Sequence, residues 1–319
     1  MAKPAMEEWE TAAVEAADFT NVQRVDSKTY VVEISDSFNI SAVPNGGYVA
    51  GQFAAVALAH VAEHGHTNVI SAHWDFLGRS QPGRATLIVG EVKIARNMSV
   101  LYIAMYQDGQ LEEAPWVAAN AKSVIAGSVT CRSMESGPSY DVNWEPAFPP
   151  QPVDFDLLSR GQDPNWALQP RRPKRTYQHW DIYGPRHGPE NLAFRDFWLK
   201  YSSGNSIKNL DLPYVCDLTP ALAIQGFEFA HLPDGPKMLD FTSWYPTLNI
   251  HMDFKKNLPE EGVKWLRLRT TVKSVRDGRF DCDVDVFDVV GDMVAQARHM
   301  AMIVDVSRNT ANLKPSSHL

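Results

Sequence analysis

The sequence predicts an α+β fold made of two copies of one module, each an antiparallel sheet curled round a buried helix. The first observation behind this prediction is an internal repeat: AHWDF at 72–76 returns as IHMDF at 250–254, and VKIAR at 92–96 returns as VKSVR at 272–276. The second is that each copy carries one apolar, helix-forming segment among several strand-like runs. The order and spacing of the repeated pieces indicate duplication of one module.

The first copy begins with a β-branched strand at 29–35, followed by a turn at 45–47 that starts a helix reaching about residue 62. Because this helix is apolar nearly all round, we expect it to be buried. Four strands follow it, separated by turns at Pro82-Gly83, Arg96-Asn97 and Asp108-Gly109.

The second copy repeats this order, with a strand at 194–201 and a helix from about Pro220 to Ala230. Its later strands are expected near 245–254, 264–275, 280–290 and 293–306. One long helix wrapped by an antiparallel sheet is the hot-dog architecture, so the predicted fold is a double hot-dog. The expected domains are 1–130 for the N-terminal hot-dog, 131–190 for a connector, 191–312 for the C-terminal hot-dog, and 313–319 for a tail.

The connector holds ten of the 21 prolines, which predicts an extended chain rather than a third core. It also contains a basic cluster, RRPKR at 171–175. This cluster is interpreted as a solvated face. The alternative is that the cluster binds an anionic group such as a nucleotide phosphate.

Composition excludes several function classes. The 319 residues include 30 Lys and Arg against 38 Asp and Glu, and the net charge of −8 has the wrong sign for a general nucleic-acid-binding protein. The three cysteines lack CxxC spacing, so neither a disulfide framework nor a zinc site is expected. No GxSxG, GxGxxG, GxxxxGK[ST] or HExxH motif is present, and no cofactor or metal is expected.

No segment is expected to span a membrane, because the longest apolar stretch, 48–62, falls short of the roughly 20 residues required. The acidic N-terminal stretch lacks the apolar core of a secretory signal. The sequence finishes Ser317-His318-Leu319, which is similar to the SKL peroxisomal address. We therefore expect a reduced, intracellular protein in the peroxisome or the cytoplasm.

The sequence resembles the acyl-CoA thioesterase II-like double hot-dog proteins. Within the thioesterase-like superfamily it is similar to the fungal-type members. The resemblance covers most of the chain except the connector and the extreme N-terminus. The matching pieces lie at 44–48, 73–83, 107–109, 197–198, 212–217, 247–249 and 291–295. Their order and spacing are specific for the fold, although no single piece is.

The resemblance implies a hydrolytic site in which an aspartate, a hydroxyl residue and a glutamine hold and polarise the attacking water. By position, the aspartate is Asp217 and the hydroxyl residue is Thr247. The glutamine position falls on His299, which departs from the family pattern. Either histidine takes over the positioning of water, or Gln296 is the equivalent residue, or this member performs different chemistry.

The residues themselves also point to Asp217, which directly precedes the second helix, where free N–H groups and the helix dipole favour negative charge. A cap for that helix is already supplied by Thr219 and Pro220, so Asp217 is available for chemistry. His299 is expected to face inward, because it shares its strand face with small apolar residues. A satisfied core histidine is the alternative.

Thr247 poses a conflict. Strict alternation puts its side chain on the same strand face as His251 and Asp253, away from the apolar face, whereas His299 points inward. A β-bulge, or a site at the junction of the two copies, would reconcile the two positions. His73, Asp75, His251 and Asp253 are themselves expected to be strand-pairing residues rather than ligands.

Copy one has no carboxylate equivalent to Asp217. Instead it offers Asn45, Gly46 and Gly47, whose backbone N–H groups are expected to bind substrate at an oxyanion or phosphate. The alternative is a plain turn. A loop with Glu63, His64 and His66 lacks the spacing of a metal site.

We therefore expect a thioesterase that hydrolyses an acyl-CoA or carrier-bound acyl thioester by direct attack of water, without a covalent intermediate. One alternative is a hot-dog hydratase, dehydratase or cyclase acting on a polyketide-like intermediate, since fold does not determine function. Another is a non-catalytic acyl-binding protein. The expected partners are the acyl substrate and further copies of the chain, with no nucleic acid and no membrane.

Overall fold

The computed structural model describes residues 14–107, 120–133, 148–172, 174–187, 194–231 and 243–310, together with positions 117 and 142. Its strands are β1 Gln23–Arg24, β2 Thr29–Ile34, β3 Asn39–Ile40, β4 Val43–Pro44, β5 Asn68–Phe76, β6 Gly83–Ala95, β7 Met98–Tyr106, β8 Ile125–Arg132, β9 Trp166–Leu168, β10 Trp180–Pro185, β11 Phe194–Tyr201, β12 Ser243–Trp244, β13 Thr247–Phe254, β14 Leu266–Arg276, β15 Arg279–Phe287, β16 Met293–Met302 and β17 Val304–Asp305. Its α-helices are α1 Gly46–Val61, α2 Phe155–Ser159, α3 Arg175–Gln178, α4 Leu212–Cys216, α5 Pro220–His231 and α6 Ser307–Thr310.

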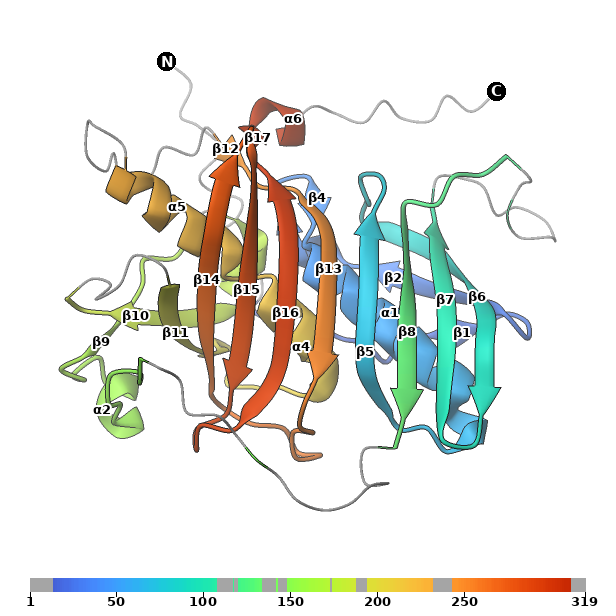
Figure 1. Ribbon diagram of the computed structural model, residues 1–319, viewed down its shortest axis with the longest axis horizontal. Coiled ribbons are helices and arrows are strands. Elements are labelled where there is room, and N and C mark those ends of the chain that lie inside the picture. The colour runs from blue at the N-terminus through green and yellow to red at the C-terminus, as the bar shows by residue number, and fades with distance from the viewer. Residues whose placement is uncertain are drawn as a thin grey trace.

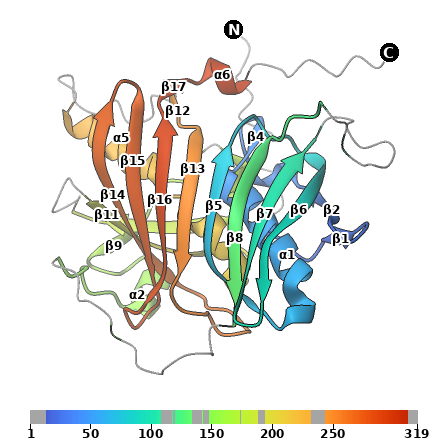
Figure 2. The same ribbon diagram turned by 45° about the vertical axis from the view of Figure 1, so that its right-hand side comes forward.

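One antiparallel sheet of thirteen strands dominates the molecule, in the order β1-β2-β6-β7-β8-β5-β13-β16-β15-β14-β11-β10-β9 (Figure 1). Helices α1, α4 and α5 lie on one side of it, as the turned view in Figure 2 shows. The structure therefore confirms a mixed α and β protein with a large antiparallel sheet.

The two halves of the sheet are built in the same order. Inside the flanking strands β1, β10 and β9, and read toward the centre of the sheet, the first half runs β2, β6, β7, β8, β5 and the second half runs β11, β14, β15, β16, β13. If the five strands of each copy are numbered in chain order, both halves have the spatial order 1-3-4-5-2. The halves join where β5 pairs with β13, and there His73 lies opposite His251. The prediction that the two HxDF motifs are strand-pairing segments is confirmed.

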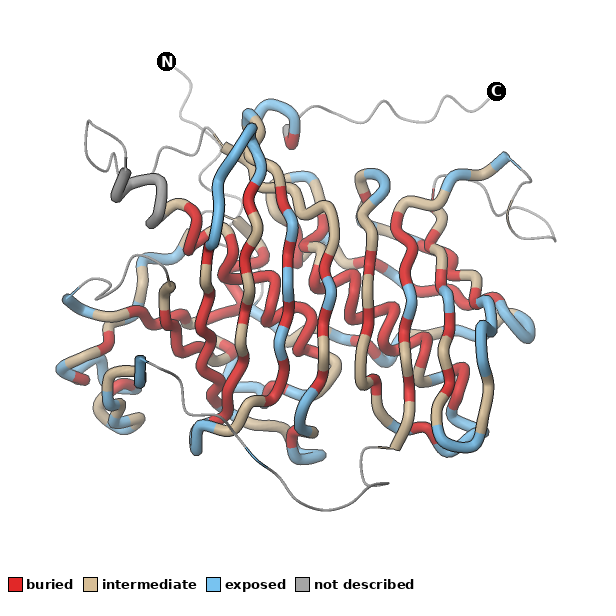
Figure 3. The backbone as a smooth tube through the Cα atoms, in the orientation of Figure 1, coloured by how far each residue is buried: buried red, intermediate tan, exposed pale blue. Residues whose placement is uncertain are grey.

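Helix α1 lies in the concave side of the first half and is buried along nearly its whole length (Figure 3). Its apolar side chains pack on β5, β7 and β8, as the all-round apolar pattern predicted. Asn45 begins the helix by accepting a hydrogen bond from the N–H of Tyr48. A second helix, α4, packs across the start of α1. For the second copy, the sequence predicted α5 but not this short helix.

The conformation of the connector corrects the sequence prediction. Within 131–190, the described residues include α2, β9, α3 and β10, and β10 pairs with β11 in the main sheet. Proline density suggested an extended chain, but aromatic residues between the prolines form a small core with residues of the second copy. Its buried members are Leu158, Trp166, Tyr183, Trp198 and Trp265. Burial of these rings offsets the entropy of ordering the segment.

Two sequence predictions fall outside the described residues: the Asp108-Gly109 turn and the C-terminal Ser317-His318-Leu319. Among the helices that the structure describes, none is long and apolar enough to cross a membrane.

Gly47 allows α1 and α4 to approach each other closely. A Cβ atom at this position would lie 2.2 Å from the carbonyl oxygen of Pro213 and 2.6 Å from Cβ of Asp217. Helix propensity alone would make Gly47→Ala stabilising by about 1 kcal/mol, because alanine is a better helix former than glycine. The clash with α4 is therefore the reason to expect destabilisation. We expect a loss of about 2–3 kcal/mol in the free energy of unfolding, measured by urea denaturation.

The matched control is Gly90→Ala in β6, where the nearest atom to the new Cβ would be 3.4 Å away. That variant is expected to change stability by about 0.5 kcal/mol or less. Equal stability of the two variants would show that the contact between α1 and α4 tolerates a methyl group.

Candidate active site

The candidate site forms where the two halves meet, around the carboxylate of Asp217. Asp217 ends α4, and its side chain points at the first turn of α1 from the other copy. The N–H of Gly47 donates a hydrogen bond of 2.9 Å to Asp217 Oδ2, and the Asn45 side-chain amide lies 3.5 Å from the Asp217 carbonyl oxygen. The positive end of the α1 dipole therefore faces the carboxylate.

This contact corrects the sequence interpretation of Asp217. The sequence placed its charge at the N-terminus of the helix that follows it in the chain. In the structure, the backbone donor that holds the carboxylate comes from α1. Asp217 lies at the end of α4, and its side chain is directed toward the first copy. Asn45, Gly46 and Gly47 are thus at the site, but the Gly47 N–H already binds Asp217 instead of being open to a ligand.

Thr247 joins the site through a β-bulge. The register of β13 against β16 shifts between Thr247 and Asn249, so the alternation of the strand breaks at Leu248. The hydroxyl of Thr247 then donates to Asp217 Oδ1 over 3.3 Å. The conflict found in the sequence is resolved both by a bulge and by a site at the junction of the two copies.

His299 completes the cluster from β16. Its side chain is 1% exposed, which confirms that it faces inward, and its Nδ1 lies 3.6 Å from Asp217 Oδ1. Neither ring nitrogen has a hydrogen-bond partner among the described residues. A buried imidazole left this way costs about 1–3 kcal/mol, so it is not the satisfied core histidine of the alternative interpretation.

Burial determines the charge states of this pair. Removal from water raises the pKa of Asp217 to about 6. The hydrogen bonds from Gly47 and Thr247 lower this pKa, but their effect is smaller than that of burial. Removal from water also lowers the pKa of His299 to about 3. Near pH 7 the site therefore holds an ionised aspartate beside a neutral histidine, the state in which the carboxylate can accept a proton.

Gln296 does not belong to this cluster, which corrects the alternative that made it the water-holding residue. It is exposed on the other face of β16, where its amide donates to Asp285 Oδ1 over 2.9 Å. The sequence register that placed His299 inward is therefore the one the fold uses.

Tyr177 is a neighbour of the site that the sequence did not indicate. It comes from α3 in the connector, is buried, and donates its hydroxyl hydrogen to the carbonyl oxygen of Leu218 over 3.2 Å. The negative charge of Asp217 contributes to raising the Tyr177 pKa, after the larger effect of burial. No periodic pattern in the proline-rich segment marks this residue, so only the fold reveals it.

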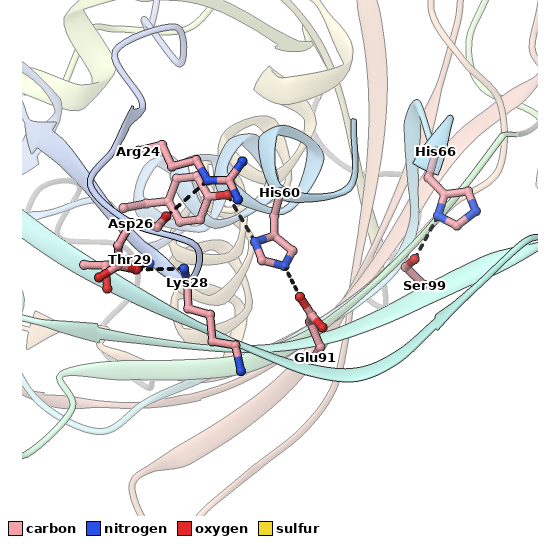
Figure 4. Close-up of polar contacts among 9 residues, drawn as sticks. Arg24, Asp26, Lys28, Thr29, His60, His66, Glu91 and Ser99 are labelled. Carbon is pink, nitrogen blue, oxygen red and sulfur yellow. Dashed lines mark hydrogen bonds and ion pairs between the residues drawn. The ribbon is translucent and has the colours of Figure 1, made fainter. Parts of the chain in front are cut away.

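A separate polar cluster lies at the other end of α1 (Figure 4). There His60 joins the hydroxyl of Tyr30 at 3.1 Å to the carboxylate of Glu91 at 3.0 Å, and His66 pairs with Ser99 at 2.9 Å. These contacts tie the end of α1 to β2 and β6 and give His66 a structural partner. Among the described residues, no group of three or more His, Cys, Asp or Glu side chains is placed to hold a metal ion.

Comparison with known families matches both halves of the chain. Residues 34–124 match the N-terminal domain of acyl-CoA thioesterases, and residues 149–303 match the C-terminal domain. A curated relative, the thioesterase-like protein TwmA of Talaromyces wortmannii, is 31% identical over 94% of this chain and 95% of its own length.

Solved structures with the same fold include enzymes of two kinds. The acyl-CoA thioesterase II TesB2 of Mycobacterium marinum superposes with a TM-score of 0.60 at 16% identity, covering 94% of this chain and 98% of its own. The dehydratase domain of the CurJ module of the curacin polyketide synthase gives a TM-score of 0.52 at 11% identity, covering 90% and 95%. At these identities the similarity concerns the fold alone.

Proposed function

Because this chain belongs to the acyl-CoA thioesterase family, we propose that it hydrolyses a thioester to the free acid at the Asp217 cluster. The proposed substrate is an acyl-CoA or a carrier-bound acyl group. The observation that carries this proposal is a buried aspartate with a raised pKa beside a neutral histidine whose ring nitrogens lack partners.

The proposed architecture is a double hot-dog, with one helix per half-sheet. It is supported by the identical strand order of the two halves and by the place of α1 and α5 in the two repeats. In this arrangement the catalytic centre is asymmetric, because copy one contributes a helix N-terminus where copy two contributes the carboxylate.

In the proposed reaction, water bound between Asp217 and His299 attacks the acyl carbonyl carbon. Asp217 takes the proton of this water as the new C–O bond forms. The tetrahedral intermediate then breaks its C–S bond, and the thiolate leaves with the proton that Asp217 held. Thr247 orients the carboxylate, and His299 supplies the missing contact that fixes the water.

The first test is release of free thiol from a panel of short, medium and long acyl-CoAs. Since Asp217 must be ionised to accept a proton, kcat/KM is expected to rise with pH through about 6 and then level off. Absence of thiol release from every acyl-CoA and from acyl-carrier thioesters would contradict the proposed hydrolysis.

A second candidate is a dehydratase or hydratase acting on a polyketide-like thioester. It is favoured by one specific feature, the histidine at the position of the family glutamine beside a carboxylate, a pair suited to removing a proton next to a carbonyl. It predicts water loss from a 3-hydroxyacyl thioester without thiol release, seen as new absorbance of the conjugated product. A non-catalytic acyl-binding protein would show neither reaction. Self-association and a peroxisomal or cytoplasmic location stay predictions from the sequence.

A further inference from the structure

The basic side chains of the motif at 171–175 fall into two groups, according to whether they contact a carboxylate. Arg171 contacts Asp181 at 3.0 Å and Ser202 at 3.2 Å, and Arg175 forms an ion pair with Asp36. These two arginines are neutralised at the surface, as the solvated interpretation of the motif expects.

Arg172 and Lys174 are different. Neither has a carboxylate partner among the described residues: Arg172 donates to the amide oxygen of Gln225, and Lys174 donates to the hydroxyl of Ser41 at 2.5 Å. Both are half-buried, and burial lowers the pKa of each. Two partly desolvated cations with only neutral partners are an unfavourable arrangement that an anion would relieve.

Both cations line a hollow of about 60 Å³ beside the first turns of α5. At roughly 15 Å³ for each water molecule, this is room for about four waters. The rest of its wall includes Ile40, Tyr177, Ala221, Gln225, Trp244 and Tyr245. No acidic side chain lies among its described lining residues, although the whole chain carries a net charge of −8.

Tyr177 connects this hollow to the candidate active site. The Arg172 guanidinium lies 5.8 Å from the centre of the Tyr177 ring, and the hydroxyl of the same tyrosine bonds to the carbonyl of Leu218, the residue after Asp217. The charges of both Arg172 and Asp217 act on the Tyr177 pKa. The hollow and Asp217 are therefore both neighbours of Tyr177.

Arg195 adds to the positive charge. It is half-buried at the start of β11, has no carboxylate partner among the described residues, and is close enough to Arg172 for their repulsion to lower its pKa, after burial. It also lines a larger pocket of about 410 Å³. Arg195 therefore adds a third positive charge in the neighbourhood of Arg172.

We propose that Arg172 and Lys174 bind a phosphate group of the pantetheine carrier that delivers the thioester to Asp217. This inference rests on the proposed hydrolysis, because it takes the substrate to be a thioester. Arginine offers paired N–H donors and lysine a compact charge, the combination that commonly holds phosphate. The phosphate can belong to coenzyme A or to the phosphopantetheine arm of a carrier protein, which share this chemistry.

Calorimetric titration of the protein with coenzyme A, 4′-phosphopantetheine and pantetheine tests the proposal without requiring turnover. Arg172→Gln and Lys174→Gln are each expected to weaken binding of the two phosphorylated ligands about tenfold or more, and to leave pantetheine binding unchanged. Affinity of the wild type for the phosphorylated ligands should fall with added salt. Tighter binding of coenzyme A than of 4′-phosphopantetheine would identify the free cofactor as the source, and equal binding the carrier arm.

The matched control is Arg171→Gln, which removes one positive charge from the same motif at a paired surface position. It is expected to change affinity by less than about twofold. Arg172→Lys keeps the charge and shows whether the paired donors matter, while melting temperatures confirm folding. Equal affinity of the wild type for pantetheine and its phosphorylated forms, or equal weakening by Arg171→Gln, would overturn the proposal. Because binding is read directly, this failure is distinguishable from a failure to hydrolyse thioesters.

Discussion

Asp217→Asn is expected to lower turnover by at least about 100-fold while leaving the protein as stable as the wild type, or more stable, at pH 7. An asparagine can still accept the hydrogen bond from Gly47, so the packing of α1 on α4 is kept. It cannot take the proton of an attacking water. Loss of activity without loss of fold separates a chemical role from a structural one.

The stability effect follows from the raised pKa of Asp217, about 6 in the folded protein against about 3.9 in an unfolded chain. Between these pH values the folded state binds more protons than the unfolded state, so stability falls as pH rises from about 4 to about 6. Above pH 6 the whole cost of burying the charge is present, at most about 3 kcal/mol for a shift of two units. Asparagine avoids that cost, and its advantage should vanish near pH 4. Urea unfolding at pH 4, 5.5 and 7 measures this.

Asp211→Asn is the matched control for this variant. Burial raises the pKa of Asp211 to about 6 as well, but its carboxylate accepts hydrogen bonds from Tyr201 and the N–H of Lys208, outside the candidate site. This variant is expected to keep wild-type turnover. If Asp217→Asn retained more than about a tenth of the wild-type turnover, Asp217 would not be the base.

His299→Leu is expected to reduce kcat about 100-fold and to stabilise the protein, whereas His299→Gln is expected to keep kcat within about tenfold. Leucine removes the two unpartnered nitrogens from the core but cannot hold water. Glutamine restores the amide expected from the family resemblance. Wild-type activity of the leucine variant would exclude His299 from the reaction. A glutamine variant as inactive as the leucine variant would show that proton transfer, not positioning, is the role of the imidazole.

The same two variants should also change the acid sensitivity of the protein. The pKa of His299 is about 3 when folded and about 6.5 in an unfolded chain, so the unfolded state binds more protons between these values. The titration of His299 therefore costs nothing above about pH 6.5, and it lowers the stability of the protein as pH falls from there toward 3. Both substitutions remove this loss, which unfolding curves at pH 5 and 7.5 would show.

Much of the fold follows from local patterns in the sequence. The repeated HxDF segments pair with each other as β5 and β13, because each copy of the repeat places its second strand at the junction of the two half-sheets. The apolar surface of α1 required burial, and the small residues on one face of β16 required His299 to point inward. Each of these features depends on periodicity, which a single segment carries.

The sequence by itself therefore determined the duplication, the buried helix and the inward histidine, along with the candidate residues Asp217 and Thr247. Only the tertiary structure decided how they meet. The α1 N-terminus of one copy reaches the Asp217 carboxylate of the other, a bulge turns Thr247 inward, and the proline-rich segment folds to bring Tyr177 beside them. The physical reason is that these contacts join segments far apart in the chain, where packing and backbone hydrogen bonding override local pattern.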